Sequence, residues 1–360
     1  MIVQCRVVDA NWKKRLSDEG IVNLELAKAR NLESRGMVEI IDKQVTSLDK
    51  VVNTYKTKIL VPESPGATKP DYWIKNSFDY KKKVKVAWVQ DYSKPNGGAE
   101  LSNQTICRIG ELLGFDLALV TPQSFNVSIL TAADIIIINN FFEFQDEHYT
   151  IMYNVLYEKR IPYVKYDHDY REIHKRADKA RQMFTMSLLN IFISPDHMNK
   201  TIDILGEQIR SHSICLPIAI DTRSYINYTN DRIKNSVLIP RIEKCKATVR
   251  NDIETLKKFE KITVIGNNEF VAPDGIVCDI IEKQEPAKMP ELYNMYEYMY
   301  HKPDVAWAGE RIYLEAKLCG CIPITNENVG HVSWGELTSE QLTDALYTFW
   351  KEIDKLCLKR

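Results

Sequence analysis

The sequence has no apolar run long enough to cross a bilayer. Its longest apolar stretch, residues 132–139, spans eight residues, whereas a membrane helix needs about 20. The first residues also lack the apolar core of a secretory signal peptide. We therefore expect a soluble, cytoplasmic protein, or one of the host cytoplasm if the source is a virus.

Neither sign of charge predominates. The 360 residues include 48 Lys and Arg against 49 Asp and Glu, which excludes a uniformly basic nucleic-acid binder but leaves room for a local basic cleft. The eight cysteines form no CxxC pair, so we expect reduced thiols and no zinc site. With 44% hydrophobic and 27% charged residues, the composition is that of a folded protein of two or three domains.

Residues 1–45 are predicted to form a small accessory domain. Its expected elements are a strand, a helix and a second strand, at residues 3–8, 26–35 and 37–41. This α+β or β-barrel-like pattern is weakly similar to short accessory modules of phage proteins. Residues 46–82 contain three prolines and one glycine and are predicted to be a linker.

From residue 83 onward, short apolar strands alternate with helical stretches, the pattern of a doubly wound α/β protein. The first domain, residues 83–225, has expected strands at 84–89, 116–120, 135–138, 163–166, 190–194 and 214–218. The second, residues 226–340, has them at 237–239, 262–265, 275–278, 298–301 and 322–325. Expected helices include 100–113, 251–259, 290–295 and a closing helix, 339–358, in the C-terminal segment 341–360. Two Rossmann-like halves would place a cleft between them.

Residues 307–325, WAGERIYLEAKLCGCIPIT, are the most informative stretch. They predict a helix, 310–318, that ends at a glycine and leads through a proline into a buried strand. Its free N–H groups and positive dipole end suit a phosphate, and Glu310 and Arg311 lie at this end. Arg311 has two possible partners, a phosphate or its neighbour Glu310. Glu315, one turn further, is placed to accept hydrogen bonds from sugar hydroxyls.

Two clusters follow expected strands of the first domain. Gly97 and Gly98 precede a helix, where bare backbone approaches a ligand closely and the helix start favours anions. Asp167, His168 and Asp169 follow a strand that ends at the crevice where doubly wound proteins bind ligands. His168 and Asp169 suit contact with a sugar or proton transfer, whereas Asp167 with Asp169 suits a divalent cation. The plainer alternatives are a tight turn at the glycines and a helix N-cap at Asp169.

The second domain offers two cations after its first strand, Arg241 and, five residues later, Lys246. Negative charge grows on a diphosphate when its bond to a sugar breaks, and fixed cations in a dry cleft stabilise that charge. Arginine presents a fork to two oxygens and lysine a point charge. The alternative is that these residues only solvate the surface.

Taken in order, these segments resemble the large retaining group of nucleotide-sugar glycosyltransferases with the GT-B fold (a GT4-like pattern), over about residues 84–358. The family's donor motif, Glu-x7-Glu before a small-residue turn and a proline, matches at Glu315 and at residues 319–323, but its first Glu falls on Trp307. In the family the first Glu touches the transferred sugar and the second holds the ribose. The resemblance therefore implies that the nucleotide half of the site is kept and the sugar half altered.

The resemblance also implies roles outside this motif. Arg241 and Lys246 match the family's arginine and lysine on the diphosphate, and the Gly97–Gly98 loop faces donor phosphate and acceptor. The string Tyr-x-His-Asp-aromatic, which contains His168 and Asp169, is similar to one in bacteriophage DNA α-glucosyltransferases. We therefore prefer a role for these two residues at the reacting sugar over a metal site.

These expectations describe a hexosyl- or pentosyltransferase that takes its sugar from a nucleotide diphosphate sugar and needs no metal or cofactor. The likeness implies retention, in which the leaving phosphate takes the acceptor's proton; inversion would require Asp169 or His168 as the base. The phage-like features favour modified DNA bases as acceptor, and the neutral charge favours a glycan, lipid or protein. Two rivals remain: a non-catalytic nucleotide-sugar binder, which Trp307 keeps open, and a GT-A enzyme that binds a metal through Asp167 and Asp169.

Overall fold

The structure is a computed structural model that describes residues 2–7, 21–25, 38–42, 83–94, 97–228, 231–266 and 270–358. The chain divides into two compact units, residues 1–79 and 80–360. In the first unit, three strands pair antiparallel in the order β2-β1-β3: β1 (Ile2–Val7), β2 (Ile21–Glu25) and β3 (Val38–Asp42). The two expected strands correspond to β1 and β3, and β2 is additional. The expected helix 26–35 and linker 46–82 lie outside the described residues.

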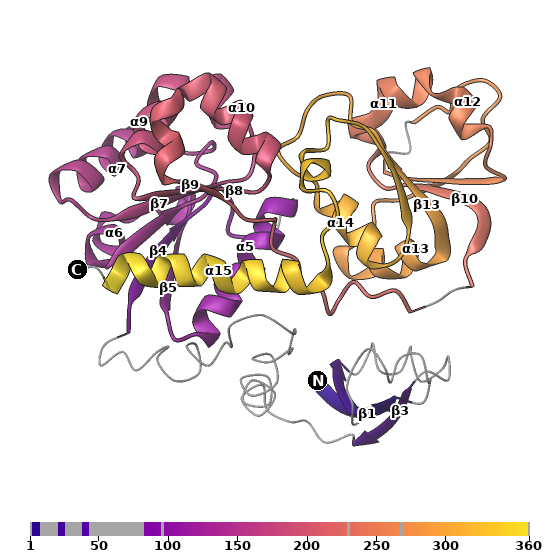
Figure 1. The fold of residues 1–360 in the computed structure, drawn as a ribbon, viewed down its shortest axis with the longest axis horizontal. Coiled ribbons are helices and arrows are strands. Elements are labelled where there is room, and N and C mark those ends of the chain that lie inside the picture. Colours follow the sequence, from indigo (N-terminus) through magenta and orange to yellow (C-terminus); the bar gives the residue numbers. More distant parts are fainter. Residues whose placement is uncertain are drawn as a thin grey trace. The chain divides into compact units, whose positions relative to one another are not determined.

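The second unit opens with a six-stranded parallel sheet in the order β5-β4-β6-β7-β8-β9 (Figure 1). Its strands are β4 (Lys85–Val89), β5 (Asp116–Val120), β6 (Ile135–Ile138), β7 (Tyr163–Asp167), β8 (Leu189–Phe192) and β9 (Ser213–Cys215). The chain leaves β4 toward β5 and then returns to β6 on the other side. This reversal is the topological switch point at which such sheets bind ligands, beyond the carboxyl ends of β4 and β6.

Helices cover both faces of this sheet. They are α5 (Gly98–Leu112), α6 (Val127–Ala132), α7 (Asp146–Glu158), α8 (Arg171–Lys175), α9 (Ala177–Met186) and α10 (Pro195–Leu205). The strands β4, β6 and β7 are almost wholly buried, as parallel strands covered on both faces must be.

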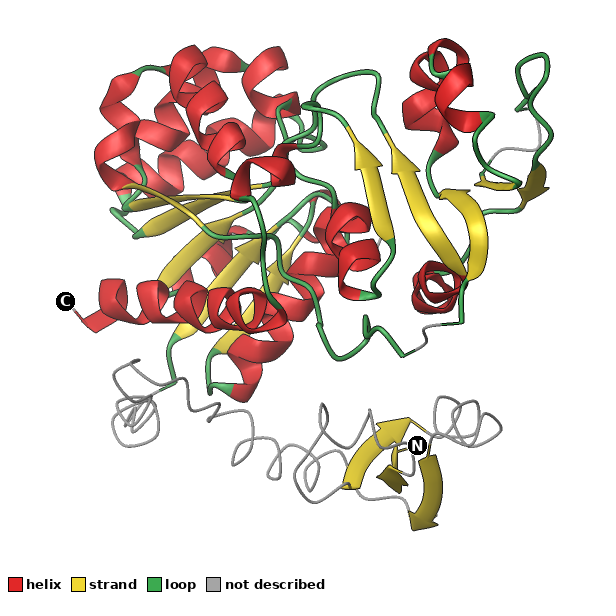
Figure 2. Cartoon of the chain, turned by 45° about the vertical axis from the view of Figure 1, so that its right-hand side comes forward, coloured by secondary structure: helices red, strands yellow, loops and turns green. Residues whose placement is uncertain are grey.

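The second half is a five-stranded parallel sheet in the order β12-β11-β10-β13-β14 (Figure 2). Its strands are β10 (Ile233–Ile239), β11 (Lys261–Ile265), β12 (Asp279–Ile281), β13 (Tyr296–His301) and β14 (Ile322–Thr325). Its helices are α11 (Ile242–Asn251), α12 (Ile253–Leu256), α13 (Met289–Met295) and α14 (Arg311–Leu318). Two parallel-sheet halves confirm the expected α/β architecture.

Two predicted elements of this half are wrong. The expected strand 275–278 is loop, and the strand follows it as β12; Gly275 has a positive φ of 82°, a turn conformation that glycine adopts without strain. The expected helix 251–259 is replaced by α11 and the short α12. The apolar residues of α11 that are buried, Ile242, Cys245 and Val249, have helical spacing.

The last helix, α15 (Ser339–Leu358), returns from the second half to the first and lies along its sheet (Figures 1 and 2). Trp350 is fully buried there, 4.5 Å from Phe115 and 6.4 Å from Trp88 between ring centroids. Its indole N–H donates to the carbonyl of Ile106 at 2.9 Å. Among the described helices, none is both long and apolar enough to span a bilayer.

Candidate functional site

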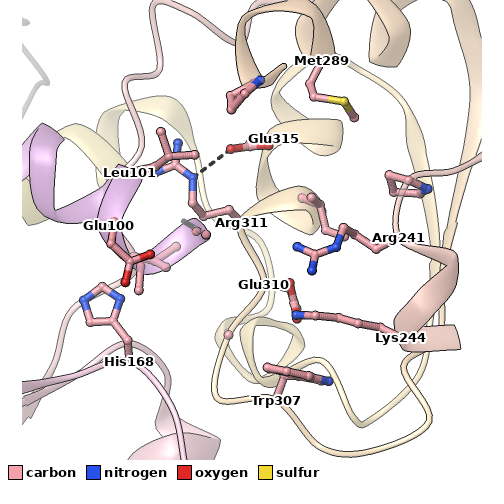
Figure 3. A pocket seen from close by; sticks show the side chains of 18 of the residues that line it. Glu100, Leu101, His168, Arg241, Lys244, Met289, Trp307, Glu310, Arg311 and Glu315 are labelled. Carbon is pink, nitrogen blue, oxygen red and sulfur yellow. Dashed lines mark hydrogen bonds and ion pairs between the residues drawn. The ribbon is translucent and has the colours of Figure 1, made fainter. Parts of the chain in front are cut away.

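A cleft of about 650 Å³ lies between the two parallel-sheet halves. One wall comes from the first half, at the carboxyl ends of its strands and the start of α5; the other comes from α11, α14 and the loop before α14 (Figure 3). Eight of the nine site residues predicted from the sequence line it: Gly97, Gly98, His168, Asp169, Arg241, Glu310, Arg311 and Glu315.

Lys246 is the ninth, and the structure corrects its placement. It lies on the exposed side of α11 and does not line the cleft. Lys244, two residues earlier on the same helix, takes the place beside Arg241. Because a helix turns about 100° per residue, positions two apart face nearly opposite directions. Arg241 itself caps the start of α11 and is paired with Glu243.

Lys244 belongs to a compact cluster on the second-half wall (Figure 3). Its ammonium is hydrogen-bonded to Glu310 Oε1 and lies 3.4 Å from the centroid of the Trp307 ring. Burial lowers the pKa of Lys244, and Glu310 opposes this shift. Burial would raise the pKa of Glu310, but the groups around it, Lys244 foremost, together hold that pKa below its usual value. The result is a pre-formed ion pair beneath an aromatic ring.

Glu310 is also the N-cap of α14. Its backbone N–H donates to His331 Nδ1 at 2.8 Å, so the protein itself uses this amide. The helix nevertheless presents its first turn to the cleft, since Gly309, Glu310, Arg311 and Ile312 all line it. The dipole of α14 therefore favours negative charge in the cleft.

Arg311 is not paired with its neighbour Glu310. It is 7% exposed, and its Nε donates to Glu315 Oε1 at 2.9 Å (Figure 3). One terminal nitrogen donates to Ser102 Oγ at 3.0 Å and to the carbonyl of Ala219 at 2.6 Å. Arg311 thus joins α14 to the first half, and Glu315 enters the cleft with one oxygen already engaged.

Gly98 serves for space, and neither Gly97 nor Gly98 has a positive φ. Gly97 has φ of −165°, which any residue adopts, so the alternative of a tight glycine turn does not apply at this residue. A β-carbon on Gly98 would lie 3.2 Å from Cδ of Arg311. The bare backbone at this position lets the side chain of Arg311 cross from the opposite wall.

His168 is 5% exposed and lines the cleft. Both of its ring nitrogens are buried, and neither has a hydrogen-bond partner in the part of the chain that the structure describes. Burial lowers the pKa of His168 to about 3, although the charge of Asp167 opposes the shift. The imidazole is therefore neutral near pH 7, with one donor and one acceptor unused at the edge of the cleft.

Asp169 is occupied on both oxygens. Oδ1 accepts from the backbone N–H of Arg171 at 2.8 Å, and Oδ2 accepts from Arg171 Nε at 2.9 Å and from Asn140 Nδ2 at 3.3 Å. Asn140 also accepts from the backbone N–H of His168 through Oδ1 at 3.3 Å. These bonds fix the turn that carries His168, so the position of Asp169 favours orientation over proton transfer.

Asp167 faces away from the cleft. Its oxygens accept from Lys165 Nζ at 3.0 Å and contact His197 Nε2 at 3.1 Å, and Lys165 also binds Glu172 at 2.9 Å. Burial would raise the pKa of Asp167, but Lys165 holds it down to about 2. The GT-A alternative, with Asp167 and Asp169 on one cation, is wrong because the two carboxylates serve separate networks and the fold has two Rossmann-like halves.

Several residues that line the cleft were not predicted from the sequence. They include Tyr92, Glu100, Asn140, Arg171, Tyr225, Lys244 and the segment 283–286. Of these residues, Lys244 could have been predicted from the sequence, because the apolar spacing of α11 places it on the side of the helix next to Arg241. The segment 283–286 has no chemical motif, so only its place after β12 brings it to the site.

No protein-family model and no curated protein matches this sequence. Solved structures do match. One is Alr3699/HepE of Anabaena in complex with UDP-glucose, 15% identical with a TM-score of 0.52, over 76% of this chain and 92% of that one. Another is an alpha-glucosyltransferase in complex with UDP and a 13-mer DNA containing a HMU base, 13% identical with a TM-score of 0.51, over 77% of this chain and 91% of that one. This likeness confirms the GT-B fold expected from the sequence.

Proposed function

We propose that the protein is a glycosyltransferase that binds a nucleotide diphosphate sugar in the cleft between its two Rossmann-like halves. The observation that carries the proposal is the meeting of Arg241, Lys244 and the N-terminus of α14 on one wall, opposite the bare backbone of Gly97 and Gly98. Cations and a helix N-terminus are the groups that stabilise a diphosphate as its charge grows. The GT-B fold supports the same interpretation.

In this proposal each donor contact has a named residue. Arg241 and Lys244 bind the diphosphate, with Lys244 in the role that the sequence suggested for Lys246. Glu315 accepts hydrogen bonds from the ribose through the oxygen that Arg311 leaves open. Because Arg241 is paired with Glu243 and Lys244 with Glu310, the incoming phosphates must share or displace these carboxylates.

The reaction joins an acceptor hydroxyl oxygen to the anomeric carbon while the bond from that carbon to the diphosphate oxygen breaks. The electron pair leaves with the nucleoside diphosphate, and in the retaining route the leaving phosphate oxygen takes the acceptor's proton. His168 then supplies a neutral hydrogen bond to the sugar, since a group with a pKa of about 3 is a weak base near neutral pH. Asp169 orients the turn that carries it. No step in this route requires a metal.

For the acceptor we propose a modified DNA base. Two observations support this acceptor: the motif around His168, and a neighbour of the same fold in complex with DNA. A DNA acceptor predicts a steep loss of transfer with rising salt, because released counterions drive such binding. Activity that is flat with salt contradicts DNA and favours a glycan, lipid or protein acceptor.

The donor site is tested by calorimetric titration with UDP, GDP and ADP and their common sugar conjugates, with and without EDTA. Lys244→Ala and Lys246→Ala form a matched pair, since both remove one lysine from α11. We expect Lys244→Ala to weaken binding of the preferred nucleotide about 10- to 100-fold, as loss of a charge-assisted contact does. Lys246→Ala should bind like the wild type, and EDTA should change nothing.

Two results would contradict the proposal. Absence of binding to the folded wild type, or equal binding by both lysine variants, removes the donor site. Binding without any release of sugar from the donor, to water or to an acceptor, favours a non-catalytic nucleotide-sugar binder. Trp307 favours that second candidate, because it stands where the family has the Glu that touches the transferred sugar.

A further inference from the structure

Arg311 is the side chain through which the two walls of the cleft touch. Its guanidinium is bonded to Glu315 on its own helix, to Ser102 on α5 and to the carbonyl of Ala219, at 2.6 to 3.0 Å. It is 7% exposed and Glu315 is 4% exposed. Three of the five N–H groups of Arg311 are therefore engaged within the protein.

The contact continues beyond Arg311 into the glycine loop. Ser102 accepts from Arg311 and donates its own hydroxyl hydrogen to the carbonyl of Gly98 at 2.8 Å. Gly98 in turn leaves the space that the stem of Arg311 fills. An unbroken series of hydrogen bonds therefore runs from Glu315 through Arg311 and Ser102 to Gly98.

Some other hydrogen bonds between the halves do not reach the donor carboxylate. Ser194 Oγ donates to the carbonyl of Ala308, Trp334 Nε1 donates to the carbonyl of Ile193, and Ser333 Oγ accepts from the backbone N–H of Asp196 at 3.2 Å. Arg311 combines a contact across the halves with a contact to Glu315, and Tyr225 contacts the side chains of both Arg311 and Glu315.

We propose that Arg311 is a positioning residue that couples nucleotide recognition at Glu315 to the contact between the two halves. The proposal rests on the proposed function, because it assigns Glu315 to the nucleotide. A nucleotide bound at Glu315 then stabilises the arrangement in which Arg311 reaches Ser102. The glycine loop is thereby held against the donor when the donor is present.

A double-mutant cycle tests this coupling between residues that do not touch. UDP affinity is measured by calorimetry in the wild type, Ser102→Ala, Glu315→Ala and the double variant. We expect Ser102→Ala to weaken UDP binding about 5-fold in the wild type, and less than about 2-fold once Glu315 is gone, because coupled sites are not additive. Ser333→Ala is the matched control, since it also removes a serine hydroxyl between the halves; its effect should be the same in both backgrounds.

The proposal would be overturned if Ser102→Ala weakened UDP binding by the same factor in the wild type and in Glu315→Ala. If the wild type binds no nucleotide, the proposed function fails, and thermal unfolding without ligand still tests the contact itself. In that experiment the effects of Arg311→Lys and Ser102→Ala on the melting temperature should be coupled. The double variant should then melt no lower than Arg311→Lys alone. Additive losses in melting temperature would show that Arg311 and Ser102 do not act together.

Discussion

His168 brings unused hydrogen-bonding capacity to the cleft. Both of its ring nitrogens are buried and have no hydrogen-bond partner among the described residues, and such a pair carries a desolvation cost that a ligand hydroxyl would relieve. We expect His168→Ala to lower kcat for transfer about 100-fold, the range of a hydrogen bond made in the transition state. UDP affinity should be unchanged, since UDP lacks the sugar.

The pH dependence of kcat separates this role from that of a base. With a pKa of about 3, His168 stays neutral, so kcat should show no histidine inflection between about pH 6 and 8. His174, which is exposed on α8, provides the control, and His174→Ala should transfer sugar at the wild-type rate. An inflection near neutrality that disappears in His168→Ala would show instead that His168 exchanges a proton.

Lys244 and Lys246 of α11 have the same chemistry, so residue type alone does not show which of them faces the cleft. Spacing borrowed from a family selected Lys246 as the second cation, whereas Lys244 is the lysine of α11 that lines the cleft. The orientation of a side chain depends on where its helix begins, and α11 begins at Ile242. Glu315 and Glu310 were easier to place, because the glycine after α14 fixes the end of that helix.

At the scale of elements, α15 packs on the first half although it follows the second half in the sequence. Trp350 packs under Gly110, where an added β-carbon would lie 2.1 Å from the indole ring. We expect Trp350→Ala to lower the free energy of unfolding by about 3–5 kcal/mol, as other buried aromatic truncations do. Chemical denaturation followed by circular dichroism measures this, with the exposed Asp344→Ala on the same helix as control. A change below about 0.5 kcal/mol, typical of surface substitutions, would contradict the packing.

The elements that the sequence predicted well share one property. The strands β5, β6 and β14 and the helix α15 occupy the predicted residues, because their apolar runs are bounded by polar or turn residues. Prediction failed at β12, a three-residue edge strand that is mostly exposed. Such a strand takes its conformation from its pairing with β11, and pairing partners are not visible in local sequence.

At the scale of the whole molecule, the cleft is electrically balanced. Five cationic and five acidic side chains line it: Arg171, Arg241, Lys244, Lys283 and Arg311 against Glu100, Asp169, Glu285, Glu310 and Glu315. The sequence revealed the charges but not their pairing, since Lys244 and Glu310 lie 66 positions apart. Only the folded arrangement of the two halves shows which charges are already neutralised.

Burial of neutral histidines makes the stability of the whole molecule depend on pH. Burial lowers the pKa of His168 to about 3 and that of His301 and His331 to about 4, from 6.5 when exposed. The unfolded chain therefore binds more protons than the folded one below pH 6.5. Their contribution to stability is complete above that pH and is lost as pH falls toward the folded values.

Asp91 acts in the opposite direction. Burial raises its pKa from 3.8 to about 7, so its contribution is complete below 3.8 and is lost as pH rises through 7. When Asp91 is set against the three histidines, two histidines remain uncompensated. Each of them lowers the free energy of unfolding by about 1.4 kcal/mol per pH unit on acidification, so the expected slope is about 3 kcal/mol per unit below pH ~6. Urea denaturation at about pH 7, 6 and 5 measures this slope, which lies above the range where ordinary carboxyl groups titrate.

The Asp91→Asn variant makes the test specific, because it removes this opposing carboxyl group and keeps the shape of the side chain. Its free energy of unfolding should fall more steeply with acidification than that of the wild type, by about one further group. A free energy of unfolding that stays flat or increases as the pH falls from about 7 to 5 would mean that the histidines are charged or exposed in solution. A slope that Asp91→Asn leaves unchanged would place Asp91 in its ordinary ionised form, paired with Arg171, which lies 3.9 Å away.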